Sequence, residues 1–192
     1  MAREMKAAGR PRDPKTAENI KSTTLRLMRE QGYAAVSIAS IISESGVAKQ
    51  TIYNRWKTKA DLVLDAIFEE TERYASAPDH DFNKSCREQL YQFLIEVFEH
   101  LERDSRIICA LIASAQEDKL FQKSFRERFV NPREKIVEDI LRRAHSLGQI
   151  STERDIPTLV AFIHGAFWYP LLNGIQPDRK LAQNIVAEIF RH

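Results

Sequence analysis

The stretch SIASIISESGVAKQTIYNRWKTKADLVLDAI, residues 37–67, contains two short helical patterns separated by one glycine. Ser37 is placed to cap the first helix, because a serine oxygen accepts hydrogen bonds from the free backbone N–H groups at a helix start. Gly46 is placed to end it, because glycine readily adopts the left-handed conformation of a helix C-terminus. The apolar residues of this helix recur on one side: Ile38, Ile41 and Ile42. The pattern predicts a short amphipathic helix followed by a tight turn.

A second short helix is predicted from Lys49 to about Trp56. Val47 is expected to pack inward from the turn, and Ile52 and Trp56 to form the buried side of the helix. The other side chains point outward and carry polar groups: Lys49, Gln50, Thr51, Tyr53, Asn54 and Arg55. Two short helices joined by a glycine turn, the second exposing polar groups, form a helix-turn-helix. We therefore expect the second helix to enter the major groove of B-DNA.

The outward side chains have the chemistry that DNA recognition needs. Gln50 and Asn54 can each make paired hydrogen bonds to adenine, and Lys49 can donate to guanine. Thr51 and Tyr53 can bind phosphate oxygens. This segment is therefore predicted to contact both bases and backbone.

Further contacts are predicted at the ends of the neighbouring helices. Thr58 precedes Asp61 by three residues, which predicts reciprocal caps at the start of the next helix. Lys59, in the first turn of that helix, would add an ammonium to unpaired backbone N–H groups and bind a phosphate there. Ser37 is included in the predicted DNA-contacting set.

Residues 15–67 resemble the DNA-binding domain of the tetracycline-repressor (TetR) family of bacterial transcription regulators. Eight positions match the family's pattern at fixed spacing: Ile38, Gly46, Val47, Thr51, Ile52, Tyr53, Trp56 and Lys59. Three positions depart from it, because Ile42 and Ser45 replace common alanines and Ala48 replaces a serine that caps the recognition helix. The missing cap should cost about 1 kcal/mol of local helix stability. It also leaves no hydroxyl at position 48 to contact DNA.

Charge is divided unevenly along the chain. Residues 1–60 hold 12 Lys/Arg and 5 Asp/Glu, a balance of +7, whereas residues 61–192 hold 17 and 22, a balance of −5. Such a division is typical of a nucleic-acid-binding head on an acidic body, although a solvated basic face gives the same count. Residues 1–14 are predicted to form a flexible basic arm whose Arg10 and Arg12 enter the minor groove. A disordered basic tail is the alternative.

Composition indicates a soluble globular protein, and the resemblance to the TetR family implies a bacterial one. Of the 192 residues, 43% are hydrophobic and 29% are charged. The nearly apolar stretch 159–172 is shorter than the roughly 20 residues of a membrane-spanning helix, and the charged N-terminus carries no export signal. Cys86 and Cys109 are expected to be free thiols, a redox pair being the alternative. We expect a cytoplasmic protein that lies on the nucleoid when it is bound to DNA.

The chain is predicted to be all-α, with about nine helices. The predicted segments are a DNA-binding domain at 15–60, a connecting helix at about 59–77 and a C-terminal effector-binding and dimerisation bundle at 83–192. Pro78 and the polar residues after it mark the boundary. In the C-terminal part, Pro132 should kink or split a long helix over 118–147, which Gly148 ends.

The last two helices are predicted to join two chains. The segment 159–172 is apolar nearly all round, so the core of one chain can cover only one side of it. The predicted interface residues are Phe162, Phe167, Leu171, Leu181, Ile185 and Ile189. Residues 125–172 also resemble the C-terminal domain of AcrR-like members of the TetR family. That resemblance implies a homodimer joined by a four-helix bundle, with two heads on a palindromic operator in double-stranded DNA.

These features predict a sequence-specific transcriptional regulator, namely a repressor that a small hydrophobic or amphipathic effector releases from DNA. The residues considered for an effector cavity are Phe98, Cys109, Phe121, Phe125, Phe162, His164, Phe167 and Trp168. Aromatic residues at helical spacing more often form ordinary core, and a lone histidine such as His164 is more often a hydrogen-bonded interior residue. The cavity residues therefore stay open at this level.

Two other functions stay open: a DNA-binding dimer without a ligand, constitutive or controlled by a partner, and an activator. An enzyme is not expected, because the sequence lacks GxGxxG, P-loop, HExxH and GxSxG motifs and any Cys/His cluster with metal spacing. Asp79, His80 and Asp81 are adjacent metal-type ligands, but a solvated loop explains them. We expect no cofactor, no metal and no membrane partner.

Overall fold

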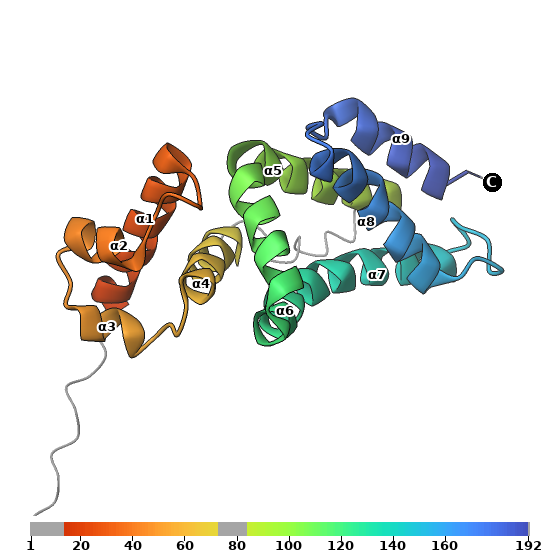
Figure 1. Ribbon diagram of the computed structural model, residues 1–192. Helices are drawn as coiled ribbons and strands as arrows, with labels where there is room; N and C mark the ends of the chain where they lie inside the picture. Colours follow the sequence, from red (N-terminus) through yellow and green to blue (C-terminus); the bar gives the residue numbers. More distant parts are fainter. Residues whose placement is uncertain (1–13, 73–83, 192) are drawn as a thin grey trace, which may run out of the picture.

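The computed structural model describes residues 14–72 and 84–191, and all regular structure within these ranges is helical. The helices, shown in Figure 1, are α1 (Pro14–Gln31), α2 (Ile38–Ser45), α3 (Lys49–Tyr53), α4 (Lys59–Glu72), α5 (Cys86–Glu117), α6 (Lys119–Phe125), the π-helix η1 (Arg126–Val130), α7 (Asn131–Ser146), α8 (Ile156–Leu172) and α9 (Arg179–Ile189). The prediction of an all-α chain is confirmed. None of the helices in the described ranges is long and apolar enough to cross a membrane.

Helices α1 to α4 form a small head, which lies to the left in Figure 1. The head forms because each of its helices has an apolar side, and α1 packs against both α2 and α4. The fully buried side chains at its centre are Ile20, Ile41, Ile52, Leu62 and Leu64. This core holds the short helices α2 and α3, which could not persist alone at such lengths.

Helices α5 to α9 form the larger body (Figure 1). Helix α5 is 32 residues long and packs against α6, α7 and α9, while α8 lies between α7 and α9. The start of α5 is fixed by a capping box. The Ser85 hydroxyl accepts from the backbone N–H of Glu88, and the Glu88 carboxylate accepts from the backbone N–H of Ser85. The body therefore surrounds one long helix.

The predicted interruption before Pro132 is present. Helix α6 continues directly into η1, where the Asn131 N–H bonds to the carbonyl of Arg126, five residues back. Pro132 then lies in the first turn of α7, where a missing N–H breaks no helical hydrogen bond. Gly148, with φ of +67°, follows the end of α7 as expected. One turn of the wider π geometry thus separates α6 from α7.

The head contacts the body through α4 and α1, both of which pack against α5. An ion pair joins them, with Arg29 Nε 2.8 Å from the Oδ1 of Asp104, a carboxylate that is almost fully buried. The predicted end of the connecting helix and the predicted boundary at Pro78 lie outside the described residues, and α4 is described as far as Glu72.

Candidate functional site: the helix-turn-helix and an internal cavity

Helices α2 and α3 are joined by the tight turn that the sequence predicts. Ser37 caps α2 by accepting from the backbone N–H of Ser40, and the Ser40 hydroxyl accepts from the Ser37 N–H in return. Gly46 ends α2 with φ of +68°, and its N–H donates to the carbonyl of Ile42 over 3.0 Å. The Ser37 oxygen is therefore already used within the protein.

Helix α3 turns its polar side away from the head. Ile52 and Trp56 are buried beneath it, as predicted. The exposed side chains of the predicted set are Lys49, Gln50, Tyr53 and Asn54, whereas Thr51 and Arg55 are half-buried. Gln50 Nε2 donates to the Asn54 Oδ1 over 2.8 Å, and the Lys49 ammonium lies 5.6 Å from the centre of the Tyr53 ring. These contacts orient the side chains toward solvent before any DNA arrives.

The start of α3 has no side-chain cap, since Ala48 is at the capping position. Helix α3 is also shorter than predicted and ends at Tyr53. The next helix begins as the sequence predicts. The backbone N–H of Asp61 donates to the Thr58 hydroxyl over 3.0 Å, and the Thr58 N–H donates to the Asp61 carboxylate over 3.1 Å.

Lys59 differs from its prediction as a phosphate ligand. Its ammonium donates to the carbonyl oxygens of Tyr33 and Val36, over 2.7 and 2.9 Å, and lies 4.1 Å from the Tyr33 ring centre. Partial burial lowers the pKa of Lys59 below its usual value. The ammonium therefore ties α4 to the α1–α2 loop, and local sequence could not reveal that two carbonyls face it.

Three further basic residues are considered for the DNA-facing surface. Arg10 and Arg12, predicted to enter the minor groove, lie outside the described residues. Lys57, in the loop between α3 and α4, is exposed beside the recognition helix and was not predicted. A lysine next to the exposed end of α3 adds positive charge where a phosphate would pass.

Asp65 on α4 gathers three donors from different parts of the chain. Lys21 on α1 lies 2.8 Å from its Oδ2, and the Trp56 indole N–H donates to the same oxygen over 3.0 Å. Arg128 on η1 donates to its Oδ1. One carboxylate thus joins α1, the end of the recognition segment and the body.

The pKa of Asp65 reflects this arrangement. Burial opposes the charged form and acts to raise the pKa, but the hydrogen bonds from Lys21, Arg128 and Trp56 outweigh it. The net effect holds the pKa of the carboxyl below its usual value. Asp65 is therefore ionised throughout the neutral range.

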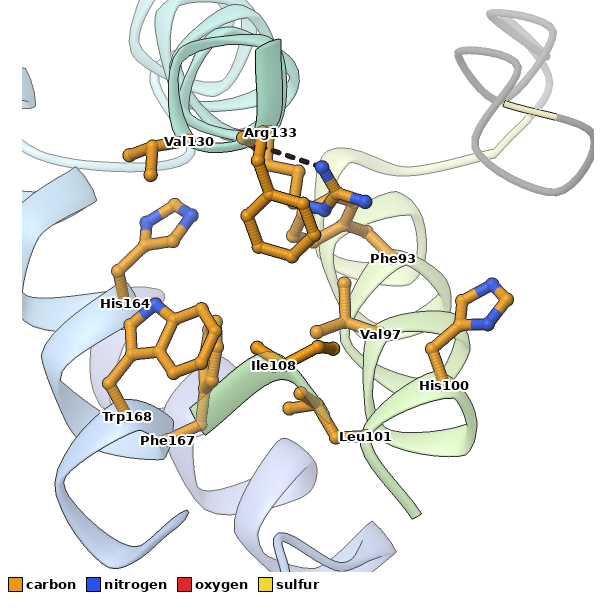
Figure 2. A pocket seen from close by; sticks show the side chains of 11 residues that line it. Phe93, Val97, His100, Leu101, Ile108, Val130, Arg133, His164, Phe167 and Trp168 are labelled. Carbon is orange, nitrogen blue, oxygen red and sulfur yellow. Dashed lines mark hydrogen bonds between the residues drawn. The ribbon is translucent and has the colours of Figure 1, made fainter. Parts of the chain in front are cut away.

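A cavity of about 40 Å³ lies inside the body, between α5, η1, α7 and α8. Figure 2 shows side chains converging on it from these elements. Its lining residues are Phe93, Val97, His100, Leu101, Ile108, Phe129, Val130, Arg133, His164, Phe167 and Trp168. The wall is therefore mainly apolar and aromatic, with a few polar groups, as ligand sites usually are.

Three of the predicted cavity residues line it: His164, Phe167 and Trp168. The others do not. Phe98 lies behind Phe167, with ring centres 5.6 Å apart, and Phe162 is 65% exposed on the outside of α8. Phe121, Phe125 and Cys109 are not in the wall; the two phenylalanines are core residues in line with Phe129. Sequence spacing could not separate Phe129 from its two neighbours.

The polar part of the wall consists mainly of Arg133 and His164. The guanidinium of Arg133 donates to the carbonyl of Phe129 over 2.7 Å and lies 3.8 Å from that residue's ring centre. Burial lowers the pKa of Arg133 to about 10. The His164 Nδ1 lies 2.9 Å from the Val160 carbonyl oxygen, but its buried Nε2 has no hydrogen-bond partner among the described residues. The expected fully bonded interior histidine is therefore only half realised.

Comparison with known proteins agrees with both parts of this architecture. Residues 20–66 match the model for bacterial regulatory proteins of the tetR family, and residues 78–189 match that for the tetracyclin repressor-like C-terminal domain. The chain belongs to the TetR family. It is a helix-turn-helix transcriptional regulator.

Three proteins are similar to this TetR-family chain over nearly their whole length. The uncharacterized HTH-type transcriptional regulator YdeS of Bacillus subtilis is 27% identical over 185 residues, which cover 95% of this chain and 92% of YdeS. The crystal structure of the TetR family regulator SCO0332 has a TM-score of 0.70 and 25% identity, covering 92% of this chain and 97% of that one. FadR from Bacillus subtilis, solved in complex with stearoyl-CoA, has a TM-score of 0.74 and 18% identity, covering 90% and 97%.

The outer face of α8 is apolar, but most of its residues are not those predicted for the dimer interface. The predicted Phe167, Leu171, Ile185 and Ile189 are buried inside the single chain, so they cannot offer a surface to a partner. The large exposed apolar side chains of α8 are Phe162 (65%), Tyr169 (75%) and Leu172 (56%), and Ile175 (62%) follows in the next loop. Leu181 is half-buried. Because α8 is apolar nearly all round, hydrophobicity alone could not tell its two faces apart.

No group of three or more His, Cys, Asp and Glu side chains that could hold a metal occurs within 14–72 and 84–191. Asp79, His80 and Asp81 lie outside these ranges. Cys86 and Cys109 are free thiols whose pKa values are raised by burial.

Proposed function

We propose that this protein is a homodimeric transcriptional repressor that binds a palindromic operator and leaves it when a small molecule binds in the cavity. The observation that carries the proposal is the position of η1. Phe129 and Val130 belong to the cavity wall, while Arg128 in the same turn is bound to Asp65 of the head. A displacement of η1 therefore changes the cavity wall and the Arg128–Asp65 contact together.

The size of the cavity supports such a displacement. About 40 Å³ accommodates at most a few water molecules, whereas pockets for drug-sized ligands measure about 300–1,000 Å³. An effector must therefore push the surrounding helices apart. Protein interiors are close-packed, so neighbouring side chains have to move with the wall.

The contacts of Asp65 provide a route from the wall to the reading helix. When Arg128 moves, Asp65 moves with it or loses a charged partner, and Asp65 also holds Trp56 at the end of the recognition segment. Two heads of a dimer must match successive major grooves, about 34 Å apart. A small rotation of each head is enough to lose that match, provided that the effector binds better to the rotated form.

The exposed apolar face of α8 supports the dimer. Phe162, Tyr169 and Leu172 recur at helical spacing on this face, with Gly165 exposed between them. A small residue at the centre of such a face lets two helices approach closely, and an uncovered patch of large apolar side chains marks an interface. The partner is a second copy of this chain.

Contacts to DNA are assigned as follows. Lys49, Gln50 and Asn54 reach base edges from the exposed side of α3, and Tyr53 and Lys57 bind phosphates. Thr51 and Arg55 are half-buried and are therefore assigned smaller contributions to DNA binding.

An effector is supported by one structural neighbour. FadR from Bacillus subtilis shares the fold and is solved in complex with stearoyl-CoA, so a fold of this kind accommodates a small molecule in that protein. The cavity of the present chain is the place where we expect its own effector to bind.

The test starts with selection of binding sites from random duplex DNA at physiological salt. We expect a palindrome, bound by a species with twice the chain mass of 22.2 kDa. Release is then measured with a panel of aliphatic and aromatic acids, amides and alcohols. Binding without a consensus, or a monomeric protein at micromolar concentration, would refute the regulator as proposed. A selected operator that no compound releases would favour a dimer without an effector.

A further inference from the structure

We infer that the cavity is a site for an apolar molecule with a single carboxylate, whose charged end binds between Arg133 and His164. The inference rests on the proposed function, since it names the class of effector that the cavity accepts. The structural basis of the inference is that Arg133 and His164 form a polar end in a cavity that is otherwise mainly apolar.

Arg133 supplies a cation without a protein anion. Its guanidinium has five N–H donors, and the bond to the Phe129 carbonyl uses one. No ion pair of Arg133 with a carboxylate is found among residues 14–72 and 84–191, although Glu134 is its neighbour in the chain. Stacking on the Phe129 ring holds the guanidinium in place but leaves its charge unbalanced. A carboxylate matches its forked donors better than any other common anion of one charge.

His164 lies at the same end of the cavity. Figure 2 shows its ring and the Arg133 guanidinium on opposite sides of the upper part of the cavity. Burial and, to a smaller extent, the Arg133 charge lower the pKa of His164. The Val160 carbonyl can only accept, so the proton of the neutral ring is on Nδ1. Nε2 then presents a lone pair toward the interior, without a partner among the described residues. A carboxylate oxygen next to Nε2 would be repelled by this lone pair unless a proton binds between the two atoms.

Binding is therefore coupled to a proton. The groups that bear on His164 are Arg133 and Glu134 from α7, and His100 lines the same cavity from α5. Burial lowers the pKa of His164, so the ring is neutral at pH 7.5 in the protein alone. A bound carboxylate adds a negative charge beside it and favours the protonated ring. One proton, shared between carboxylate and Nε2, then satisfies both groups.

The rest of the cavity selects the apolar part of the ligand. Phe93 and Val97 from α5 face Phe167 and Trp168 from α8, as Figure 2 shows. A second charge at the far end of the ligand would meet mainly apolar side chains there, at a high desolvation cost. Dicarboxylates with a remote second charge are therefore excluded in favour of compact monocarboxylates.

The experiment compares 2-naphthoate and decanoate with the neutral amides 2-naphthamide and decanamide. Titration calorimetry and thermal shift are recorded at pH 7.5 with the full chain. We expect each acid to bind at least tenfold more tightly than its amide. Calorimetry in phosphate and in Tris, whose ionisation enthalpies differ, should show uptake of up to one proton with the acids and none with the amides.

Three variants locate the effect. Arg133→Met should lose at least tenfold in affinity for the acids and little for the amides, and Arg133→Lys should show an intermediate loss because it keeps the charge but not the fork. His164→Gln should remove the proton uptake. Arg126→Met, at an exposed arginine on the adjoining π-helix η1, is the matched control and should behave as wild type. Because a buried unpaired charge is costly, Arg133→Met should melt at the same or a higher temperature without ligand.

Several results would overturn the inference: equal binding of acids and amides, acid binding unchanged in Arg133→Met, or no binding of any probe at millimolar concentration. The proposed function is judged separately, by operator release. Acids that bind through Arg133 but leave operator DNA bound would uphold the carboxylate site and refute effector release. Release by neutral compounds alone would do the reverse.

Discussion

Arg128 and Phe129 are adjacent in one π-helical turn but face different parts of the protein. The Phe129 ring lines the cavity and stacks on Phe125, with centres 5.0 Å apart. The Arg128 guanidinium binds Asp65 and lies over the ring of Phe68, both on α4. Because the two residues are adjacent in one helical turn, a single segment, η1, contacts the head through Arg128 and forms part of the cavity wall through Phe129.

Arg128→Met should uncouple the cavity from the head. The variant removes the ionic contact to Asp65 without changing the cavity wall, so a cavity ligand should bind within about twofold of its wild-type affinity. The factor by which that ligand weakens operator binding should fall from tenfold or more toward one, as a coupling of roughly 1–3 kcal/mol is lost. Fluorescence anisotropy with labelled operator, titrated with and without decanoate, measures the weakening factor, and the decanoate concentration that gives half the effect reports the ligand affinity. An undiminished factor would place the coupling elsewhere. Arg126→Met serves as control.

Asp65→Asn should lower the free energy of unfolding by about 1–3 kcal/mol at pH 7, because Lys21 and Arg128 lose a charged partner. The pKa of Asp65 is lower in the folded protein than its usual value near 3.9. Its contribution is therefore fully present above that value and is lost as the pH falls through the lower, folded-state pKa. Urea unfolding of both proteins between pH 3 and 7 should show the gap closing only in acid. A gap that widens in acid would contradict this assignment.

Side chains of α3 and of the loop after it should divide into two classes of DNA contact. Gln50→Ala should cost about 1–3 kcal/mol on the selected operator and relax preference at one position of each half-site. Lys57→Ala should weaken specific and random DNA alike and reduce the salt slope by about 0.9 per lost phosphate contact. Tyr53→Phe keeps the ring beneath Lys49 and should lose only the hydroxyl bond. Equal losses on both DNAs for Gln50→Ala would show that it merely positions the helix.

Ala48→Ser should stabilise the recognition helix. A serine at this extended position can accept from the free N–H groups of the first turn, a gain of about 0.5–2 kcal/mol. Amide hydrogen exchange of residues 49–53 reports the local change, and urea unfolding reports the global one. The control is Ala39→Ser, an exposed position inside α2, where serine should be neutral or slightly unfavourable. Faster exchange in Ala48→Ser than in wild type would contradict the geometry.

The parts of the fold that could be predicted are those set by residues close in sequence. The Ser37 cap, the Gly46 turn and the Thr58–Asp61 pair depend on contacts within four residues, and each is present as predicted. Pro132 likewise marks the break in its own helix, since the loss of an N–H is a local event.

The cavity could not be predicted in detail, because its wall depends on which faces of several helices meet. Phe121, Phe125 and Phe129 share one spacing, yet only Phe129 reaches the cavity. Arg133 looks like one more charged residue in a polar run, and nothing in the sequence shows that its guanidinium points inward. In α8, apolar residues lie on both faces, so the inner Phe167 and outer Tyr169 are indistinguishable by composition.

The small volume of the cavity also affects the effector concentration at which the protein responds. Every ligand must first separate packed side chains, so its apparent dissociation constant is its intrinsic one divided by the fraction of molecules already open. A small cavity thus raises the effector concentration at which the protein responds. Replacements at Phe125, which stacks on the wall from behind and never meets the ligand, would shift that concentration while leaving the choice of ligand unchanged.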